Sequence, residues 1–244
     1  MIPKIIHYCW FGRNPLPPLA IKCIESWKKY FPDYEIKEWN EDNFDINLIP
    51  YTQEAYQQKK YAFVSDYARF WILYHYGGLY FDTDVEVIKP FDDILNNGAF
   101  MGAEKSIRFH GDKIFVAAGL GLGSPQKHPI YKYLLDYYKT VHYIDSKGNI
   151  NTKTVCNIVT EQLEKRGLQH TNNIQTIEGI TIYPATYFNP IDFVTRRLSI
   201  KKETHSIHWY MASWEVKTWR KTFKSYIKKF IPSSLLLWYN KKNS

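Results

Sequence analysis

The sequence predicts an α/β fold in which a mostly parallel sheet is flanked by helices. Strand-like and helix-like stretches alternate through the first half of the chain, which is the pattern of βαβ units. The 244 residues, of which 45% are hydrophobic, suffice for one fairly large domain. We therefore expect a single domain over residues 1–216, followed by a tail of different composition over 217–244.

The amino-terminal stretch predicts a strand, a turn, a helix and a second strand. Residues 2–10 are rich in β-formers, and the polar segment 12–18 that follows contains prolines. Apolar side chains then recur every three or four residues over 19–30, which predicts a helix that Pro32 ends. Residues 34–39 alternate between apolar and polar side chains, as a half-buried strand does.

The next stretch predicts a long helix followed by two short strands. Residues 61–75 place aromatic side chains along one broad helical face, and the glycine pair at 77–78 ends this helix. Residues 79–81 are strand-like and lead into Asp82, and residues 85–88 form another short strand.

The second half of the chain gives fewer signals. Residues 114–123 predict one strand that runs into a glycine-rich bend, and residues 180–183 predict another strand. Helical spacing is present over 128–141 and 152–165. Beyond 183 the sequence predicts no regular element before His205.

Cysteine usage and hydropathy exclude several classes of protein. The three cysteines are too few and too scattered for a disulfide framework, and no CxxC pair suggests zinc, so we expect a reduced, cytoplasmic setting. The apolar run at the amino terminus is too short for a signal peptide. No run of 18 apolar residues is present, so we predict no membrane-spanning helix.

The positive charge of the chain belongs to its tail. Residues 217–244 hold eight basic side chains and no acid, whereas the other 216 residues carry 24 basic and 24 acidic groups. Apolar residues from Trp219 to Ile231 have amphipathic helical spacing, which suits an anionic membrane surface. The alternatives are a helix packed on the domain with a solvated basic face and, less favoured because the body is neutral, nucleic-acid binding.

Asp82 and Asp84 lie one residue apart directly after a strand-like run. Two like charges at this spacing repel each other unless a cation lies between them. On extended backbone they would share one face, about 6–7 Å apart, and could point into the crevice where α/β sheets bind ligands. Mn²⁺ or Mg²⁺ suits such oxygen ligands and keeps positions open for phosphate oxygens. The alternative is a solvated acidic turn.

Asp66 and Arg69 are separated by three residues and therefore share one helix face. The alternative role is a surface ion pair that contributes little. That alternative is weakened because the pair lies in an aromatic-rich segment whose neighbours are apolar. The glycines at 77–78 allow the backbone to come close to a ligand.

The string SDYARFWILYHYGGLYFDTD at residues 65–84 resembles the signature S-D-x-x-R-x-x-x-L-x-x-x-G-G-x-Y-x-D-x-D of DXD-containing sugar transferases. This group, glycosyltransferase family 32, includes Och1-like mannosyltransferases and bacterial capsule and lipopolysaccharide transferases. The segments IPKIIHYCWFG (2–12) and SWKKYFPDYEIKEWNEDNF (26–44) are also similar to that family. The resemblance implies a GT-A type, single Rossmann-like domain with a mixed, mostly parallel central sheet and, in this chain, an amphipathic helical tail.

The resemblance implies roles for several residues at the donor. Trp10 would border the nucleobase, with core packing as its alternative role, and Gly78 would lie close to the ligand. Asp66 and Arg69 would bind the donor sugar and its phosphates, and Asp82 would contact ribose and sugar hydroxyls. These three residues are the ones expected to take part in catalysis.

The resemblance also implies a metal site. Asp82 and Asp84 would bind the metal, and a third ligand is expected near the end of the catalytic domain. His208 is the favoured candidate, and His205 is expected to be a surface or core histidine. Ser213 and Trp214 would close over the diphosphate.

The function implied is transfer of a hexose from a nucleotide-diphosphate sugar to a glycan or lipid-linked acceptor hydroxyl, with retention, in surface polysaccharide biosynthesis. A UDP-sugar is the favoured donor and GDP-mannose is possible. Residues 104–112 and 119–123 are expected on the acceptor side, and no nucleophile is assigned, so covalent and front-face retention both remain open. The enzyme would be cytoplasmic and peripheral on the inner face of the membrane. The alternatives are a metal-dependent phosphoesterase and a non-catalytic nucleotide-sugar binding module.

Overall fold

A computed structural model describes residues 1–105, 113–192 and 197–211 of the chain. Its strands are β1 (Ile5–Cys9), β2 (Glu35–Trp39), β3 (Gly78–Tyr80), β4 (Val85–Val87), β5 (Phe100–Lys105), β6 (Ile114–Val116), β7 (Leu122–Ser124), β8 (Gln175–Ile177), β9 (Ile180–Tyr183) and β10 (Ser206–His208). Its helices are α1 (Pro18–Tyr30), the 3₁₀ turn η1 (Ile46–Leu48), α2 (Pro50–Gln57), α3 (Tyr61–Tyr76), α4 (Asp92–Leu95), α5 (Pro129–Tyr138), α6 (Val155–Glu164) and α7 (Ala185–Phe188).

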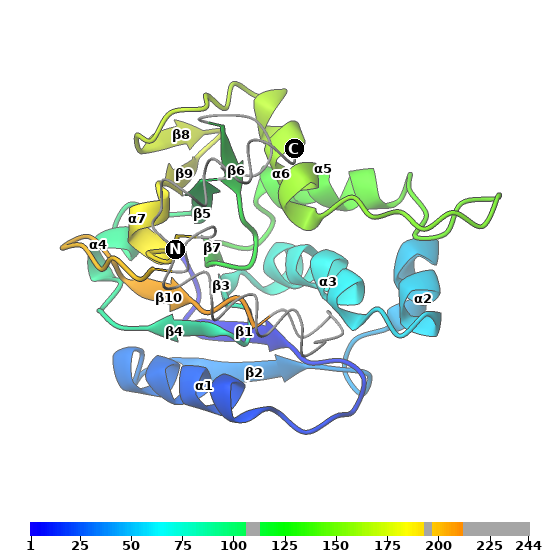
Figure 1. Ribbon diagram of the computed structural model, residues 1–244, viewed down its shortest axis with the longest axis horizontal. Coiled ribbons are helices and arrows are strands. Elements are labelled where there is room, and N and C mark those ends of the chain that lie inside the picture. The colour runs from blue at the N-terminus through cyan, green and yellow to red at the C-terminus, as the bar shows by residue number, and fades with distance from the viewer. Residues whose placement is uncertain (106–112, 193–196, 212–244) are drawn as a thin grey trace.

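The central sheet is mixed, and most of its strands run in one direction. Its order is β2-β1-β3-β7-β5-β9-β8, with β6 paired to β5, and Figure 1 shows it rising from β2 at the bottom to β8 at the top. Strands β2, β1, β3, β5 and β9 are parallel to one another, whereas β6, β7 and β8 run the opposite way. A separate two-stranded sheet pairs β4 with β10.

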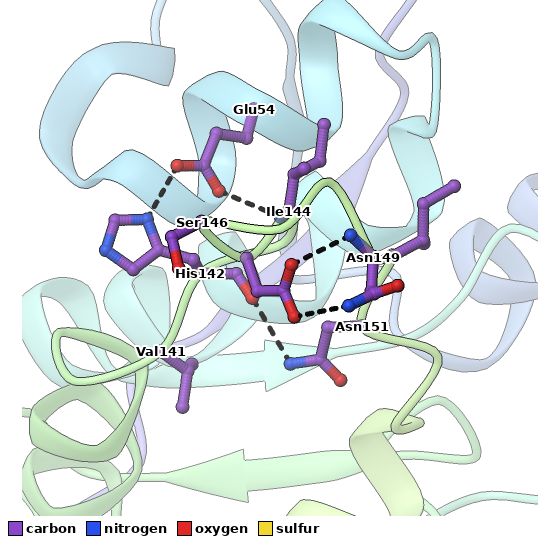
Figure 2. A pocket seen from close by; sticks show the side chains of 9 residues that line it. Glu54, Val141, His142, Ile144, Ser146, Asn149 and Asn151 are labelled. Carbon is purple, nitrogen blue, oxygen red and sulfur yellow. Dashed lines mark hydrogen bonds and ion pairs between the residues drawn. The ribbon is translucent and has the colours of Figure 1, made fainter.

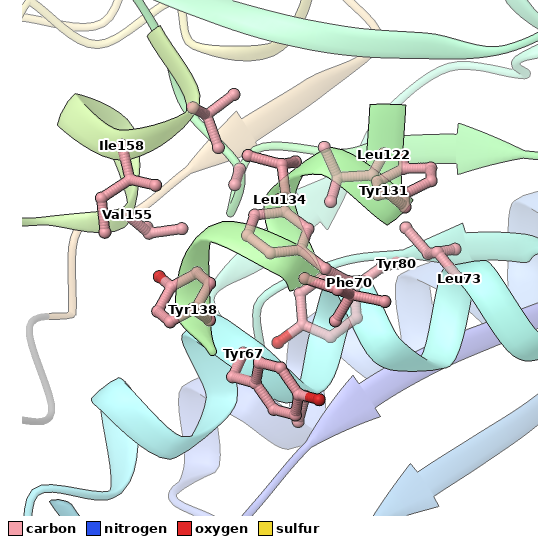
Figure 3. Packing of buried hydrophobic residues seen from close by; sticks show 14 of the residues in the cluster. Tyr67, Phe70, Leu73, Tyr80, Leu122, Tyr131, Leu134, Tyr138, Val155 and Ile158 are labelled. Carbon is pink, nitrogen blue, oxygen red and sulfur yellow. The ribbon is translucent and has the colours of Figure 1, made fainter. Parts of the chain in front are cut away.

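One face of the central sheet is covered by α2, α3, α5 and α6. Tyr67, Phe70 and Leu73 of α3 are buried there, together with Leu134 and Tyr138 of α5 (Figure 3). This helix face is rich in aromatic rings, as the spacing over 61–75 predicts. Gly77 ends α3 with a φ of 65°, a conformation that glycine adopts without a Cβ penalty.

The opposite face is covered by α1 and by the short helices α4 and α7. Trp27 of α1 is fully buried and its indole Nε1 donates to the Val85 carbonyl, which ties α1 to β4. Phe81, Phe91 and Phe188 fill the centre of this second cluster. The sheet therefore lies between two apolar layers, as expected for an α/β domain whose main strands are buried on both faces.

The largest error in the predicted elements concerns residues 114–123. The sequence predicts one strand, but the structure has two, β6 and β7, separated by a turn in which Leu120 N–H donates to the Ala117 carbonyl. This turn is built from small residues and is buried, so it lacks the polar composition that marks surface turns. The sequence also did not predict β5, β8, α2, α4 or α7.

The predicted boundary at residue 216 and the basic tail lie outside the described residues, so both remain predictions. Within the described part of the chain, no helix is long and apolar enough to cross a membrane.

Candidate active site

Three parallel strands of the sheet end at the same edge, and polar side chains follow them. Trp10 comes directly after β1, Asp82 follows β3, and Glu104 lies near the end of β5. Asp82 is fixed in place because its N–H donates to the Gly119 carbonyl over 3.1 Å. The carboxyl edge of parallel strands is where open α/β sheets bind ligands, so this edge is the candidate site.

The two DXD carboxylates lie in a turn and not on extended backbone. Val85 N–H donates to the Asp82 carbonyl over 3.0 Å, which closes a turn at Thr83 and Asp84. The prediction of a shared strand face is therefore wrong. The strand that follows the turn, β4, pairs with β10 and not with the central sheet.

Asp82, Asp84 and His208 converge on one point. One ligand atom of each lies within 4.8 Å of the other two. His208 arrives there because β10 pairs with β4 in antiparallel register, with His208 opposite Val85. Its Nε2 lies 3.2 Å from Oδ1 of Asp84. Two carboxylate oxygens and one imidazole nitrogen form a donor set that suits Mn²⁺ and, with water completing the shell, Mg²⁺.

Asp84 is stabilised as a carboxylate although it is buried. Burial alone raises its pKa, but His208 and the Met211 N–H, which donates to Oδ2 over 2.7 Å, outweigh burial and hold the pKa below its usual value. The pKa of His208 moves the other way: burial lowers it, and the charge and hydrogen bond of Asp84 raise it further than burial lowers it. Each member of the pair thus shifts the pKa of the other toward its charged form.

Arg69 lies beneath the DXD turn and is only 4% exposed. Its Nη2 lies 2.9 Å from Asp66 Oδ1, its Nη1 lies 3.4 Å from Asp82 Oδ1, and its Nε donates to the Ser65 carbonyl. These contacts use the planar fork of the guanidinium, which lysine could not reproduce. Because the Asp66–Arg69 pair is buried and joined to Asp82, it is not the surface ion pair considered as the alternative.

The other residues predicted for the donor site are placed as follows. Trp10 lies half-buried at the carboxyl end of β1, and its indole donates to the Asn14 carbonyl. Gly78 lies at the opposite end of β3 from Asp82. A Cβ at this position would collide with the Ile5 carbonyl and contact His7, so close packing in the sheet explains why the residue is glycine. The structure does not bring Gly78 to the DXD turn. Ser213 and Trp214 lie outside the described residues.

His205 is structural, as expected. It is fully buried, its Nε2 lies 2.8 Å from Asp93 Oδ1, and its Nδ1 lies 2.7 Å from the Glu203 carbonyl. These contacts anchor the segment that leads into β10, so His205 supports the position of His208 without facing the DXD turn.

Three residues near His208 were not assigned individual roles from the sequence: Glu104, Asn189 and Tyr210. The Tyr210 hydroxyl donates to Glu104 Oε2 over 3.0 Å and accepts from Asn189 Nδ2. Burial raises the pKa of Glu104, while His208 and Tyr210 oppose that shift. The only available sequence signal was the position of Glu104 at the start of the segment expected on the acceptor side.

A surface hollow between α2 and the loop after α5 is unrelated to this site. Polar side chains of this hollow are paired with one another: Glu54 with His142, as Figure 2 shows, and Asp145 with Asn149. None of the residues that line it belongs to the DXD group.

Comparison with known proteins agrees with this geometry. Residues 17–101 match the family described as the glycosyltransferase sugar-binding region containing the DXD motif. The chain is 29% identical to the uncharacterized glycosyltransferase L373 of Acanthamoeba polyphaga mimivirus, over 78% of this chain and 76% of that protein. It is 33% identical to inositol phosphoceramide mannosyltransferase 3 of Schizosaccharomyces pombe, over 41% of this chain and 29% of that protein. The chain thus spans most of the viral relative but under a third of the yeast one.

The fold also has a counterpart among solved structures. A glycosyltransferase involved in the glycosylation of the major capsid of PBCV-1 superposes with a TM-score of 0.52 at 13% identity, covering 94% of this chain and 100% of that one. This confirms the GT-A type fold. Residues 17–101 are thus similar to the sugar-binding region of DXD-containing glycosyltransferases, and the resemblance expected from the sequence is confirmed.

Proposed function

We propose that this chain is a metal-dependent hexosyltransferase that moves a hexose from a nucleotide-diphosphate sugar to an acceptor hydroxyl with retention. The observation that carries the proposal is the convergence of Asp82, Asp84 and His208 beside the buried guanidinium of Arg69. Three ligands on one side leave coordination positions free for diphosphate oxygens. Mn²⁺ or Mg²⁺, when bound there, would neutralise charge on the departing diphosphate.

The protein's own residues orient the donor. Arg69 is held by Ser65, Asp66 and Asp82, so its positive charge is fixed close to the DXD turn before any substrate arrives. A preorganised charge of this kind stabilises negative charge that develops during bond breaking. Trp10, at the end of β1, supplies an aromatic face for the nucleobase. Ser213 and Trp214 stay proposed partners of the diphosphate.

In the reaction the bond between the anomeric carbon and the diphosphate oxygen breaks, and a bond to the acceptor oxygen forms. The electron pair leaves with the diphosphate, and the acceptor proton must also be taken up. Front-face attack, in which the departing phosphate takes that proton, needs no nucleophile from the chain, whereas the covalent route needs a carboxylate near the anomeric carbon. Both routes retain the anomeric configuration.

The names of the relatives support a hexose and a lipid-linked acceptor. The yeast relatives are described as inositol phosphoceramide mannosyltransferases, which favours mannose as the sugar, whereas the sequence resemblance favours a UDP-sugar. The basic tail over 217–244 would bring the site to an anionic membrane surface. The protein would then be a peripheral enzyme on the inner face of the membrane. Surface polysaccharide biosynthesis, of capsule or lipopolysaccharide, is the proposed setting.

The proposal predicts that Mn²⁺-dependent turnover requires Asp84. We expect nucleotide release from a UDP-hexose or GDP-mannose, and a roughly 10²–10³-fold lower kcat in Asp84→Asn, because an electrostatic contribution to the transition state is lost. Nucleotide release is measured by coupled assay and the product anomer by NMR. The matched control is Asp136→Asn, an exposed acid paired with Lys132 and Lys139 on α5, which should keep full activity.

Each rival function gives a different result in this assay. A binding module would bind the donor without releasing nucleotide, and a phosphoesterase would cleave phosphate esters that carry no sugar. Within the described part of the chain, only one group of three metal-ligating side chains is present, whereas two-metal phosphoesterases need more ligands. Inversion of the anomeric configuration would contradict the proposed retention.

A further inference from the structure

The imidazole of His208 is held at only one of its two nitrogens. Nε2 faces Asp84, whereas Nδ1 is buried and has no hydrogen-bond partner among the described residues. In metal sites the second ring nitrogen usually donates to a carboxylate or carbonyl, and this bond fixes the ring orientation. His208 therefore needs some other contact to hold its ring toward Asp82 and Asp84.

Tyr210 provides that contact. Its ring centroid lies 4.4 Å from that of His208, with the planes tilted by 54°. Its backbone has a φ of 51°, a left-handed conformation that a bulky L residue rarely adopts. With this backbone, a residue only two positions after His208 lies against its ring.

The Tyr210 hydroxyl is in turn tied to two other elements. It donates to Glu104 Oε2 over 3.0 Å and accepts from Asn189 Nδ2. Glu104 belongs to β5 of the central sheet, and Asn189 follows α7 and is buried. The ring that covers His208 is therefore anchored to the rigid scaffold at its far end.

The backbone of this segment is held independently of Tyr210. Strand β10 pairs with β4, Trp209 Nε1 donates to Glu86 Oε2 over 2.9 Å, and Trp209 N–H donates to the Asp84 carbonyl. Loss of the Tyr210 hydroxyl would leave these bonds in place. What the hydroxyl controls is the position of the Tyr210 ring and, through it, the imidazole of His208.

We propose that Tyr210, anchored by Glu104 and Asn189, is a positioning residue that fixes the His208 imidazole for binding of the divalent cation. This inference rests on the metal site of the proposed function. It assigns to Glu104 and Tyr210 a share of the metal affinity although neither is among the converging ligands.

The test is a Mn²⁺ titration of the full chain by calorimetry, without nucleotide. Tyr210→Phe should raise the Kd for Mn²⁺ about tenfold, the lower end of the effect of losing a partner that orients a metal-ligating histidine. Glu104→Ala should do the same. The double variant should show the same tenfold increase as each single one, because both changes remove one tether. The matched control is Tyr56→Phe, which removes a tyrosine–glutamate hydrogen bond of the same 3.0 Å length, to Glu41.

The outcomes separate this inference from the proposed function. Wild-type Mn²⁺ affinity in Tyr210→Phe would overturn this inference but not the proposed function. The same holds if the double variant loses Mn²⁺ affinity a hundredfold, as independent effects would, or if Tyr56→Phe loses as much affinity as Tyr210→Phe. If Tyr210→Phe does not fold, wild-type affinity in Glu104→Ala overturns it. A wild-type chain that binds no Mn²⁺ would overturn both the inference and the metal dependence of the proposed function.

Discussion

At the scale of single residues, the Asp82 carboxylate is held from three sides. Tyr80 donates its hydroxyl to Oδ1, Arg69 Nη1 lies 3.4 Å from the same oxygen, and Gly119 lies next to Oδ2. A Cβ on Gly119 would overlap Oδ2, so only glycine leaves room for the carboxylate where it is. The backbone of Gly119 also accepts the Asp82 N–H, so one residue sets both the position and the clearance of the acid.

Gly119→Ala should therefore impair the site more than the fold. The overlapping atom is the end of a flexible side chain, so Asp82 can rotate away and the melting temperature should fall by less than about 4 °C. Displacement of the carboxylate should lower kcat/KM roughly 10²-fold. The control is Gly148→Ala in an exposed turn, where a Cβ would meet nothing within 4 Å. Its φ of 81° strains any L residue, so this variant should lose stability while its activity is unchanged. Unchanged activity in Gly119→Ala would show that the position of Asp82 is not critical.

At the scale of elements, one buried histidine joins three segments at the amino-terminal side of the sheet. His7 of β1 accepts a hydrogen bond at Nδ1 from Trp39 of β2, and its Nε2 lies 3.0 Å from the Gly77 carbonyl, between α3 and β3. This pattern requires neutral imidazole with the proton on Nε2. Burial is the main reason that the pKa of His7 is lowered to about 4.

The free energy of unfolding should consequently fall at a pH where His7 is protonated in the unfolded chain but still neutral in the folded one. Above pH 6.5 both states carry a neutral His7, and below the folded pKa of about 4 both are protonated. Between these values the unfolded state binds more protons, so the free energy of unfolding decreases with falling pH, by up to about 3 kcal/mol at pH 4. Urea unfolding of the wild type and of His7→Gln, measured from pH 7 to pH 4, should show this extra loss only in the wild type. Parallel pH profiles would contradict it.

The elements that the sequence predicts well are those whose own periodicity specifies them. Residues 61–81 combine a broad aromatic face with a glycine stop, and α3 and β3 are found there with small shifts in their ends. The turn at Thr83 and Asp84 could not be predicted, because the strand that follows it, β4, pairs with the distant strand β10. The paired residues Val87 and Ser206 are 119 positions apart in the sequence. The roles of Asn189 and Tyr210 depend on the same long-range pairing. Local patterns carry no information on such contacts.

At the scale of the whole molecule, the charges of residues 1–216 balance, and the net positive charge of the chain comes from residues 217–244. We expect the full chain to float with anionic vesicles. Each basic residue near a charged surface contributes about 1 kcal/mol, so changing Lys221, Lys224, Lys228 and Lys229 to glutamine should lower partitioning at least roughly a hundredfold. The control changes four lysines of the body, Lys4, Lys28, Lys132 and Lys139, to glutamine. If the tail variant and the body variant float equally well, the tail has no role in membrane binding.

The small sheet formed by β4 and β10 determines when the candidate site is completed during synthesis and folding. Asp84 belongs to the first half of the chain, but His208 lies more than 100 residues later and reaches Asp84 through the pairing of β10 with β4. During synthesis the acidic pair leaves the ribosome long before the histidine, so a nascent chain holds the DXD carboxylates without the proposed third ligand. For the proposed metal site, cation binding would therefore be one of the last events of folding, and we expect a chain that stops before residue 208 to be unable to use a sugar donor.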